Sequence, residues 1–156
     1  MMLHRKLSQG FTMVEFVITI AIVVFGIVGL YSAFQPFVAL DEMAFLKFTA
    51  SYLAQEGLEI TRNMRDTNFV KNISFVNGLS GCSSGCQADY SIGGSGPNGL
   101  SSYDPYGFLN VDGNGFYSYE AGLVTKFNRK ITIVRIGSDI MKVEVLVSWN
   151  YRNQDY

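Results

Sequence analysis

One acidic residue, Glu15, stands inside an apolar stretch and is the residue whose chemistry most needs an explanation. No charged side chain follows it until Asp41. An ionised carboxylate well inside a membrane costs about 2.5–3.5 kcal/mol on insertion scales, and acids at such depths usually have a partner. Two explanations stay open: Glu15 lies near the membrane edge and reaches the headgroups, or it pairs with a cation from elsewhere.

A cut in the chain after Gly10 would supply that cation. Cleavage of the bond between Gly10 and Phe11 frees the amine of Phe11, which is a positive charge near the same depth as Glu15. A neighbouring copy can then present its own Phe11 amine to this carboxylate. Under the second explanation, burial of that ion pair favours the assembly of many copies.

A helix must position these residues. Residues 11–36 are apolar apart from Glu15 and a few small polar side chains. They are long enough to cross the roughly 30 Å hydrocarbon core, which takes about 20 helical residues. A helix also satisfies its own backbone hydrogen bonds in lipid. Because Arg5 and Lys6 precede it, the positive-inside rule places the N-terminus in the cytoplasm and the rest of the chain outside.

Gly10, Phe11 and Glu15, with a short basic leader before them and an apolar helix after them, resemble the cleavage and methylation motif of type IV prepilins and pseudopilins. The resemblance covers residues 1 to about 66. It implies that residues 1–10 are a leader, with Arg5 and Lys6 as its basic residues. It also implies that a prepilin peptidase cleaves after Gly10 and methylates Phe11, and that Glu15 guides docking between subunits. A secretory signal peptide would instead carry its cleavage site after the apolar region.

This resemblance implies a structural subunit, not an enzyme. Its partners would be copies of itself, minor pilins, the peptidase and an ATPase-driven assembly platform in the cytoplasmic membrane. The precursor would lie in that membrane and the assembled filament outside the cell. Within the family, a type II secretion pseudopilin or a DNA-uptake minor pilin is the alternative. Outside it, the alternative is a single-span membrane protein that keeps its leader and carries an external binding module.

Composition narrows the chemistry further. The formal net charge is -1, from 12 Lys and Arg against 13 Asp and Glu. Loss of Arg5 and Lys6 leaves 12 − 2 = 10 basic residues against the same 13 acids, or -3. This balance argues against a strong nucleic-acid surface. The only histidine, His4, lies in the leader, so the mature chain lacks histidine-based catalysis and metal ligation, and we predict no cofactor.

Two small groups of residues outside the membrane segment could still form a disulfide or bind a metal ion. Cys82 and Cys86 fall on the external side, where an oxidising environment permits a disulfide. Free thiols or a metal site are the alternatives, although zinc would lack soft ligands here. Asp112, Asn114 and Glu120 offer oxygen atoms for calcium, but a full EF-hand loop is absent, so calcium is an unfavoured alternative.

Residues 37–66 continue the helix in amphipathic form. Small and apolar residues recur at alternating spacings of four and three and predict one stripe, which we expect to pack on the chain's own sheet: Leu46, Ala50, Leu53, Gly57, Ile60 and Met64. A second apolar set consists of Phe45, Phe48 and Tyr52. Either it contacts neighbouring copies, or a loop buries it.

Three finer expectations concern the helix. Pro36 removes one intrahelical hydrogen bond and crowds the preceding turn, which predicts a kink or a local loosening near residues 32–36. Gly26 and Gly29 either let helices approach closely or reflect the ordinary frequency of glycine in membrane helices. Arg62 and Asp66 are one turn apart and are expected to pair.

Residues 67–156 are predicted to form an external β-rich region. Glycine, serine and asparagine dominate residues 67–100 and indicate a long loop, with a short strand over residues 87–92. Asp112-Gly113 and Asn114-Gly115 predict a hairpin between residues 108–111 and 116–119.

Two longer strands follow in the sequence. Residues 125–135 and 140–149 each alternate apolar and polar side chains, which predicts an antiparallel pair with one apolar face. That face is the expected partner of the helix stripe, with Trp149 near the core and residues 150–156 exposed. The fold class is therefore α+β: one long N-terminal helix, membrane-spanning then amphipathic, on a small C-terminal antiparallel sheet, as in pilins.

Overall fold

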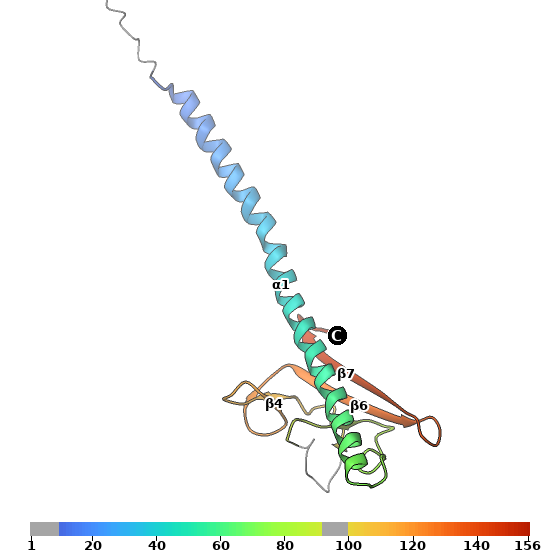
Figure 1. The fold of residues 1–156 in the computed structure, drawn as a ribbon. Helices are drawn as coiled ribbons and strands as arrows, with labels where there is room; N and C mark the ends of the chain where they lie inside the picture. The colour runs from blue at the N-terminus through green and yellow to red at the C-terminus, as the bar shows by residue number, and fades with distance from the viewer. Residues whose placement is uncertain (1–9, 92–99) are drawn as a thin grey trace, which may run out of the picture. The chain divides into compact units, whose positions relative to one another are not determined.

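The computed structural model describes residues 10–91 and 100–156 (Figure 1). The chain divides into two compact units, Met1–Phe45 and Leu46–Tyr156, and each is described by itself. One helix, α1 (Met13–Val70), contributes residues to both units, and the remaining elements are antiparallel strands. The architecture is α+β, as the sequence predicts. Arg5, Lys6 and Ile92 lie outside the described residues. The strand predicted over residues 87–92 is wrong for residues 88–91, because only Gln87 of the described part belongs to a strand.

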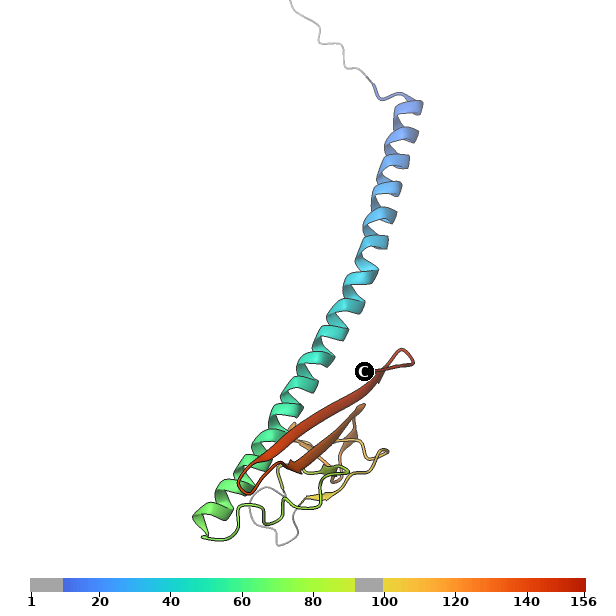
Figure 2. The same cartoon turned by 90° about the vertical axis from the view of Figure 1, so that its right-hand side faces the viewer.

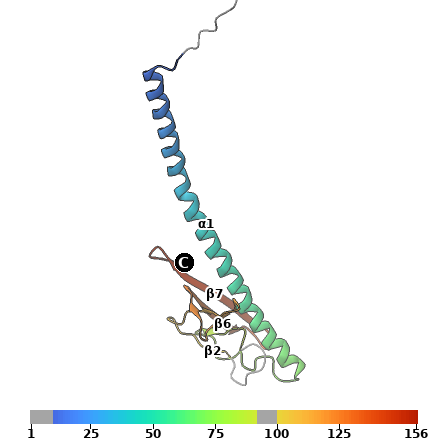
Figure 3. The same cartoon turned by 90° about the vertical axis from the view of Figure 1, so that its left-hand side faces the viewer.

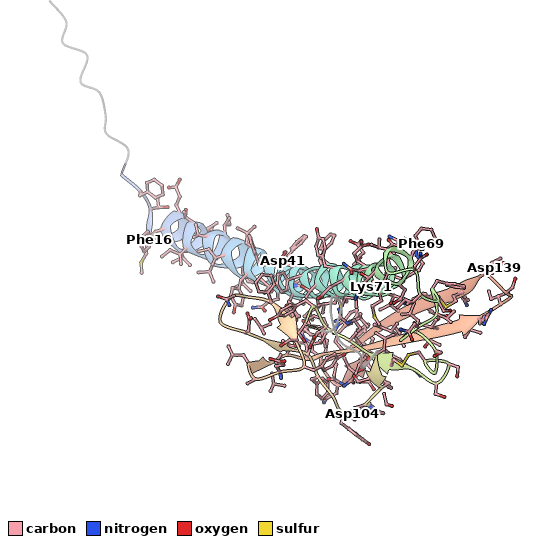
Figure 4. All side chains as sticks on the ribbon, turned by 60° about the horizontal axis from the view of Figure 1, so that its bottom comes forward. Phe16, Asp41, Phe69, Lys71, Asp104 and Asp139 are labelled. Carbon is pink, nitrogen blue, oxygen red and sulfur yellow. A yellow bond between two sulfur atoms is a disulfide. The ribbon has the colours of Figure 1, made fainter. Side chains whose placement is uncertain are left out.

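The first unit consists of the start of α1 and the residues before it. Every described residue from Gly10 to Val38 is exposed, and Figure 4 shows the side chains around Phe16 projecting away from the helix. Within the described ranges, α1 is the one helix that is long and apolar enough to cross a membrane by length and composition. Pro36 lies inside α1 and its neighbours are helical, so the loosening predicted there is not present.

The second unit contains two antiparallel sheets. The larger has the order β2-β1-β6-β7-β8 and the smaller the order β4-β3-β5. Figure 3 labels β2, β6 and β7 of the larger sheet. Its strands are β1 (Cys86–Gln87), β2 (Ser101–Ser102), β6 (Phe127–Arg135), β7 (Met141–Tyr151) and β8 (Gln154–Asp155). The smaller sheet consists of β3 (Asn110–Val111), β4 (Tyr117–Ser118) and β5 (Leu123–Val124).

The two long strands confirm the predicted antiparallel pair. The register of β6 and β7 runs without interruption from Phe127 opposite Trp149 to Arg135 opposite Met141. Burial alternates from Arg129 to Ile133 in β6 and from Met141 to Val147 in β7, so one face of these segments is turned to the core. The predicted hairpin is also confirmed, because β3 pairs antiparallel with β4, although each strand has only two residues.

The predicted helix stripe is buried against this sheet, with only Met64 half-buried at its end. Gly57 explains the close approach: a Cβ at this position would lie 3.0 Å from Val145 Cγ1 and 3.2 Å from Arg129 Cδ. A side chain on residue 57 would therefore push α1 off the strands. Leu79, Cys82, Cys86, Ala88, Ile131 and Ile133 complete the apolar cluster around Ile60.

Three predictions about α1 need correction or completion. α1 ends at Val70, one turn later than predicted. Arg62 pairs with Glu59 at 3.5 Å and not with Asp66, whose carboxylate binds Arg65 at 2.7 Å. The aromatic set is exposed, so burial under a loop is wrong: Phe45 is 68%, Phe48 66% and Tyr52 70% exposed.

The C-terminal residues 150–156 are exposed as predicted, with the exception of Tyr151. Tyr151 belongs to β7 and is only 9% exposed, and β8 folds back to pair with the end of β7. The ring of Tyr156 stacks on Trp149, with centroids 5.6 Å apart. Trp149 itself is half-buried beside Phe127, so the last residues cover one edge of the core.

Candidate functional site

Thr12 caps the N-terminal end of α1. Its Oγ1 accepts a hydrogen bond from the Glu15 N–H at 3.3 Å, and its carbonyl accepts one from the Phe16 N–H at 3.1 Å. A threonine followed three residues later by glutamate is the capping-box pattern. The sequence contains that signal, but the prediction from sequence did not use Thr12.

Glu15 lies in the first turn of α1 and is exposed. The partial positive charge of a helix N-terminus stabilises a carboxylate at this position, typically by 0.3–1 kcal/mol at an exposed site. Within residues 10–91 and 100–156, its carboxylate makes no ion pair. The helix end alone therefore compensates only part of the charge, and the oxygens remain accessible to a cation from outside.

The bond predicted to be cleaved lies just before the helix. Gly10 and Phe11 are both exposed and outside regular secondary structure, and a Cβ on Gly10 would meet no atom within 4 Å. Exposed segments without secondary structure are the usual targets of proteases. Phe11 is 75% exposed, so nothing in the described chain covers the residue that would become the new N-terminus.

Arg129 ties the second unit together. Its side chain is fully buried and donates from Nη1 to the Leu53 carbonyl and to Glu56 Oε2, both at 3.0 Å. Its Nη2 donates to the Ala88 carbonyl. One side chain of β6 thus joins α1 to the segment after β1. The strand alternation placed Arg129 on the apolar face, but nothing in the sequence identified Glu56 as its partner.

A buried acid, Asp89, organises the neighbouring loop. It is 2% exposed and accepts hydrogen bonds from the Ser91 hydroxyl at 2.6 Å and the Tyr119 N–H at 2.8 Å. The Tyr119 hydroxyl donates to the Arg129 carbonyl at 3.2 Å. Burial raises the pKa of Tyr119, although the nearby Arg129 charge acts in the opposite direction. These contacts are structural: both acids and the arginine are engaged by the fold itself.

The two cysteines form a disulfide, with Cα atoms 5.2 Å apart. Both are buried, and Gly85 between them has a φ of +114°, a left-handed conformation that suits glycine. The Cys82 carbonyl accepts a hydrogen bond from the Ile133 N–H at 3.1 Å, and Cys86 pairs with Ile131. The bridge therefore fixes the loop to the edge of β6.

Of the oxygen donors considered for calcium, Asp112 has another use, which is to hold the turn between β3 and β4. Asp112 Oδ1 accepts hydrogen bonds from the N–H groups of Asn114 at 2.8 Å and Phe116 at 2.9 Å. The bond from Phe116 is the main cause of the lowered pKa of Asp112. In the described part of the chain, no three His, Cys, Asp or Glu side chains are grouped for a metal ion. Calcium binding thus remains the unfavoured alternative.

No protein-family model matches this chain, and neither a curated protein nor a solved structure matches it. The roles expected of Gly10, Phe11 and Glu15 therefore rest on the resemblance of their motif to that of type IV prepilins and pseudopilins.

Proposed function

We propose that this chain is a structural subunit of a type IV pilin-like filament, anchored in the cytoplasmic membrane before assembly. One observation carries the proposal: an apolar helical segment, exposed from Met13 to Val38, has its single acid in the first turn and an accessible Gly10–Phe11 bond before it. This combination fits a helix that first lies in lipid and is later covered by other helices.

The exposed segment needs a cover, because exposed apolar area costs roughly 25 cal/mol per Å² in water. Lipid supplies that cover for the precursor, and the helices of other copies supply it in a filament. A helix leaves the bilayer only when other helices replace the lipid. The proposal therefore includes an assembly platform driven by an ATPase.

Cleavage changes the charge at the start of the helix. Removing residues 1–10 deletes Arg5 and Lys6 and creates an amine on Phe11, which keeps its positive charge when one methyl group is added. The Glu15 carboxylate of an adjacent copy then has a partner at the same depth. An unmatched acid would be costly in the apolar filament core, so pairing favours one axial position of each subunit.

Mass spectrometry of the protein from its native cells tests the proposal. We expect a mature N-terminus at Phe11 carrying one added methyl group, and electron microscopy should show surface filaments that contain the protein. Gly10→Val is the matched variant: it should keep residues 1–10 and form no filaments. An intact Met1 in native cells would instead support the single-span membrane protein and overturn the filament.

A further inference from the structure

β7 is an edge strand along most of its length. It pairs with β6 on one side, while on its outer side only its last residues meet β8. Trp149 exchanges backbone hydrogen bonds with Tyr156 on that outer side, at 3.1 and 2.9 Å. Alternate residues of a strand direct their backbone groups to the same edge. The odd-numbered residues from Met141 to Val147 therefore direct theirs outward, where the described chain offers no strand (Figure 1).

Apart from the charged side chains of Lys142 and Glu144, this edge lacks the features that usually protect a strand from pairing. Natural edges are short, bulged or interrupted by proline. β7 has 11 residues and contains neither proline nor glycine. Its register with β6 is continuous along the whole length of β6. Figure 2 shows it as one long, straight arrow. Such an edge is a template for one more strand.

The outward face of the edge has a symmetric order of side chains. Ile140 is 61% exposed and Leu146 60%. Between them lie Lys142 and Glu144, whose side chains are 63% and 65% exposed and pair with each other at 3.2 Å within the strand. Read in either direction, the order is apolar, charged, charged, apolar, and the two charges are opposite. A sequence of this kind is complementary to itself when two copies run antiparallel.

We propose that the β7 edge binds the β7 edge of a second copy of this chain, antiparallel and centred on Val143. In this register Lys142 of each copy lies opposite Glu144 of the other, and Ile140 lies opposite Leu146. Opposite charges directly across an antiparallel pair are stabilising. Odd-numbered residues also meet odd-numbered residues, so the outward backbone groups find their partners.

The neighbouring registers are worse. A pair centred on Glu144 places the two Glu144 carboxylates opposite each other, and like charges directly opposite destabilise a sheet. A pair centred on Val145 places Glu144 opposite Leu146. Of these registers, only the one centred on Val143 places opposite charges and apolar residues across from each other. It also keeps the core-facing side chains of both copies on the same face of the joined sheet.

The inner side of the edge has room for the added strand. A cavity of about 380 Å³ lies between α1 and the start of β7, with Leu58 and Thr61 on the helix and Met141 and Val143 on the strand. In the proposed register, Val145 of the second copy lies opposite Met141 and borders the apolar part of this cavity, which is also lined by Arg62, Arg65 and Asp139. The contact is two-fold, unlike the head-to-tail contacts of a polar filament, so the inference does not depend on the proposed function.

Cysteine cross-linking of the full-length protein in detergent tests the register. Opposite residues in non-hydrogen-bonded pairs have Cα atoms about 4.5 Å apart, within the range of about 4.4–6.8 Å for disulfides. Mixing Lys142→Cys with Glu144→Cys protein should give covalent dimers. Lys142→Cys alone should not, because those Cα atoms would lie more than about 8 Å apart. Lys142→Cys mixed with Leu146→Cys reports the register centred on Glu144, and preferential dimers there would overturn the proposal.

Charge reversal gives an independent test by sedimentation of the same detergent-solubilised protein. Lys142→Glu or Glu144→Lys places like charges opposite each other twice per dimer and should weaken association by about tenfold. The double variant K142E/E144K restores both pairs and should regain association close to that of the unmodified chain. Equal association of all four proteins, or no association of the unmodified chain, would overturn the proposal.

Discussion

The two parts of α1 have opposite surroundings within their own units. Between Leu46 and Ile60, every third or fourth side chain is buried on the sheet of the second unit. Between Gly10 and Val38, no described side chain is buried, although this part is the more apolar of the two. The amphipathic part thus finds its cover in the chain, whereas the apolar part needs lipid or other molecules.

The charges follow the same division. Arg129 and Glu56 meet inside the second unit, where each is hydrogen-bonded and the fold supplies the partner. Glu15 has a cap and a helix end but no countercharge in the described chain. This difference suggests that losing Arg129 damages folding, while losing Glu15 damages whatever the first unit binds.

The largest effect is expected at Glu15. Glu15→Ala should leave cleavage after Gly10 largely intact and should abolish or strongly reduce filaments, because the Phe11 amine of the adjacent copy loses its partner. Mass spectrometry of the N-terminus and filament counts by electron microscopy measure the two effects separately. Normal filaments from this variant would rule out charge matching.

Two further variants separate the charge of Glu15 from its place in the helix cap. Glu15→Gln keeps the shape and the backbone hydrogen bond to Thr12 but removes the charge, so it should behave like Glu15→Ala. Thr12→Ala removes the cap, at about 1 kcal/mol of helix stability, but keeps the acid, so filaments should persist. Loss of filaments in Thr12→Ala alone would indicate that the cap matters more than the charge.

The next effect concerns the stability of the second unit. Arg129→Ala removes a buried cation that serves Glu56, Leu53 and Ala88, and we expect a loss of about 3–5 kcal/mol. Trp149 is the only tryptophan and is half-buried, so its fluorescence during urea unfolding reports this unit within the full-length chain.

Arg62→Ala is the matched control for Arg129. The Arg62 side chain is 63% exposed and its ion pair with Glu59 is a surface contact, so its removal should change the free energy of unfolding by less than about 1 kcal/mol. Similar losses in both variants would contradict the central role of Arg129. Neither substitution should change the residue at which the mature protein begins, as determined by mass spectrometry.

A smaller effect is expected from the disulfide. Replacing Cys82 and Cys86 together by serine should cost about 2 kcal/mol, since the bridge closes a short loop. Both sulfurs are buried, so reductant should not lower the melting temperature of the unmodified protein until the unit begins to open. A melting temperature of the double variant equal to that of the unmodified protein would show that packing alone holds the loop.

The sequence predicted those parts of the fold that leave a periodic pattern. The helix stripe and the long strands were predictable because one face of each is buried along its whole length. Among the two-residue strands, β3 and β4 were predicted from the turn residues between them, whereas a strand such as Cys86–Gln87 has no pattern of its own and pairs with residues far away in the chain. The folded-back C-terminus was missed for the same reason: Tyr156 meets Trp149 only through the turn after β7.

The candidate site shows a similar limit. The spacing of Gly10, Phe11 and Glu15 is local, so the sequence alone carries it. Arg129 was placed on the correct face by alternation, yet its role depends on Glu56, a contact between residues far apart in the chain. Sequence patterns give the face on which a side chain lies but not the buried partner that it meets there.

The smallest expected effect is a pH dependence at Tyr119. Burial raises the pKa of this phenol above its ordinary value of about 10. The folded state therefore holds the proton more tightly, and the contribution of Tyr119 to stability is fully present below about pH 10 and is lost as the pH rises through the raised pKa. Tyr119→Phe should cost about 1 kcal/mol at pH 7 through its lost hydrogen bond to the Arg129 carbonyl.

Melting temperatures between pH 8 and about pH 11 should then fall less steeply for Tyr119→Phe than for the unmodified protein. Tyr90→Phe is the comparison variant, because desolvation and the charge of Asp112 also raise the pKa of Tyr90, but its ring is half-exposed. Solvent screens such an exposed group, so its removal should alter the alkaline slope less. If the alkaline slope were the same with and without the Tyr119 hydroxyl, deprotonation elsewhere would control the loss of stability, and the burial of this phenol would have no part in it.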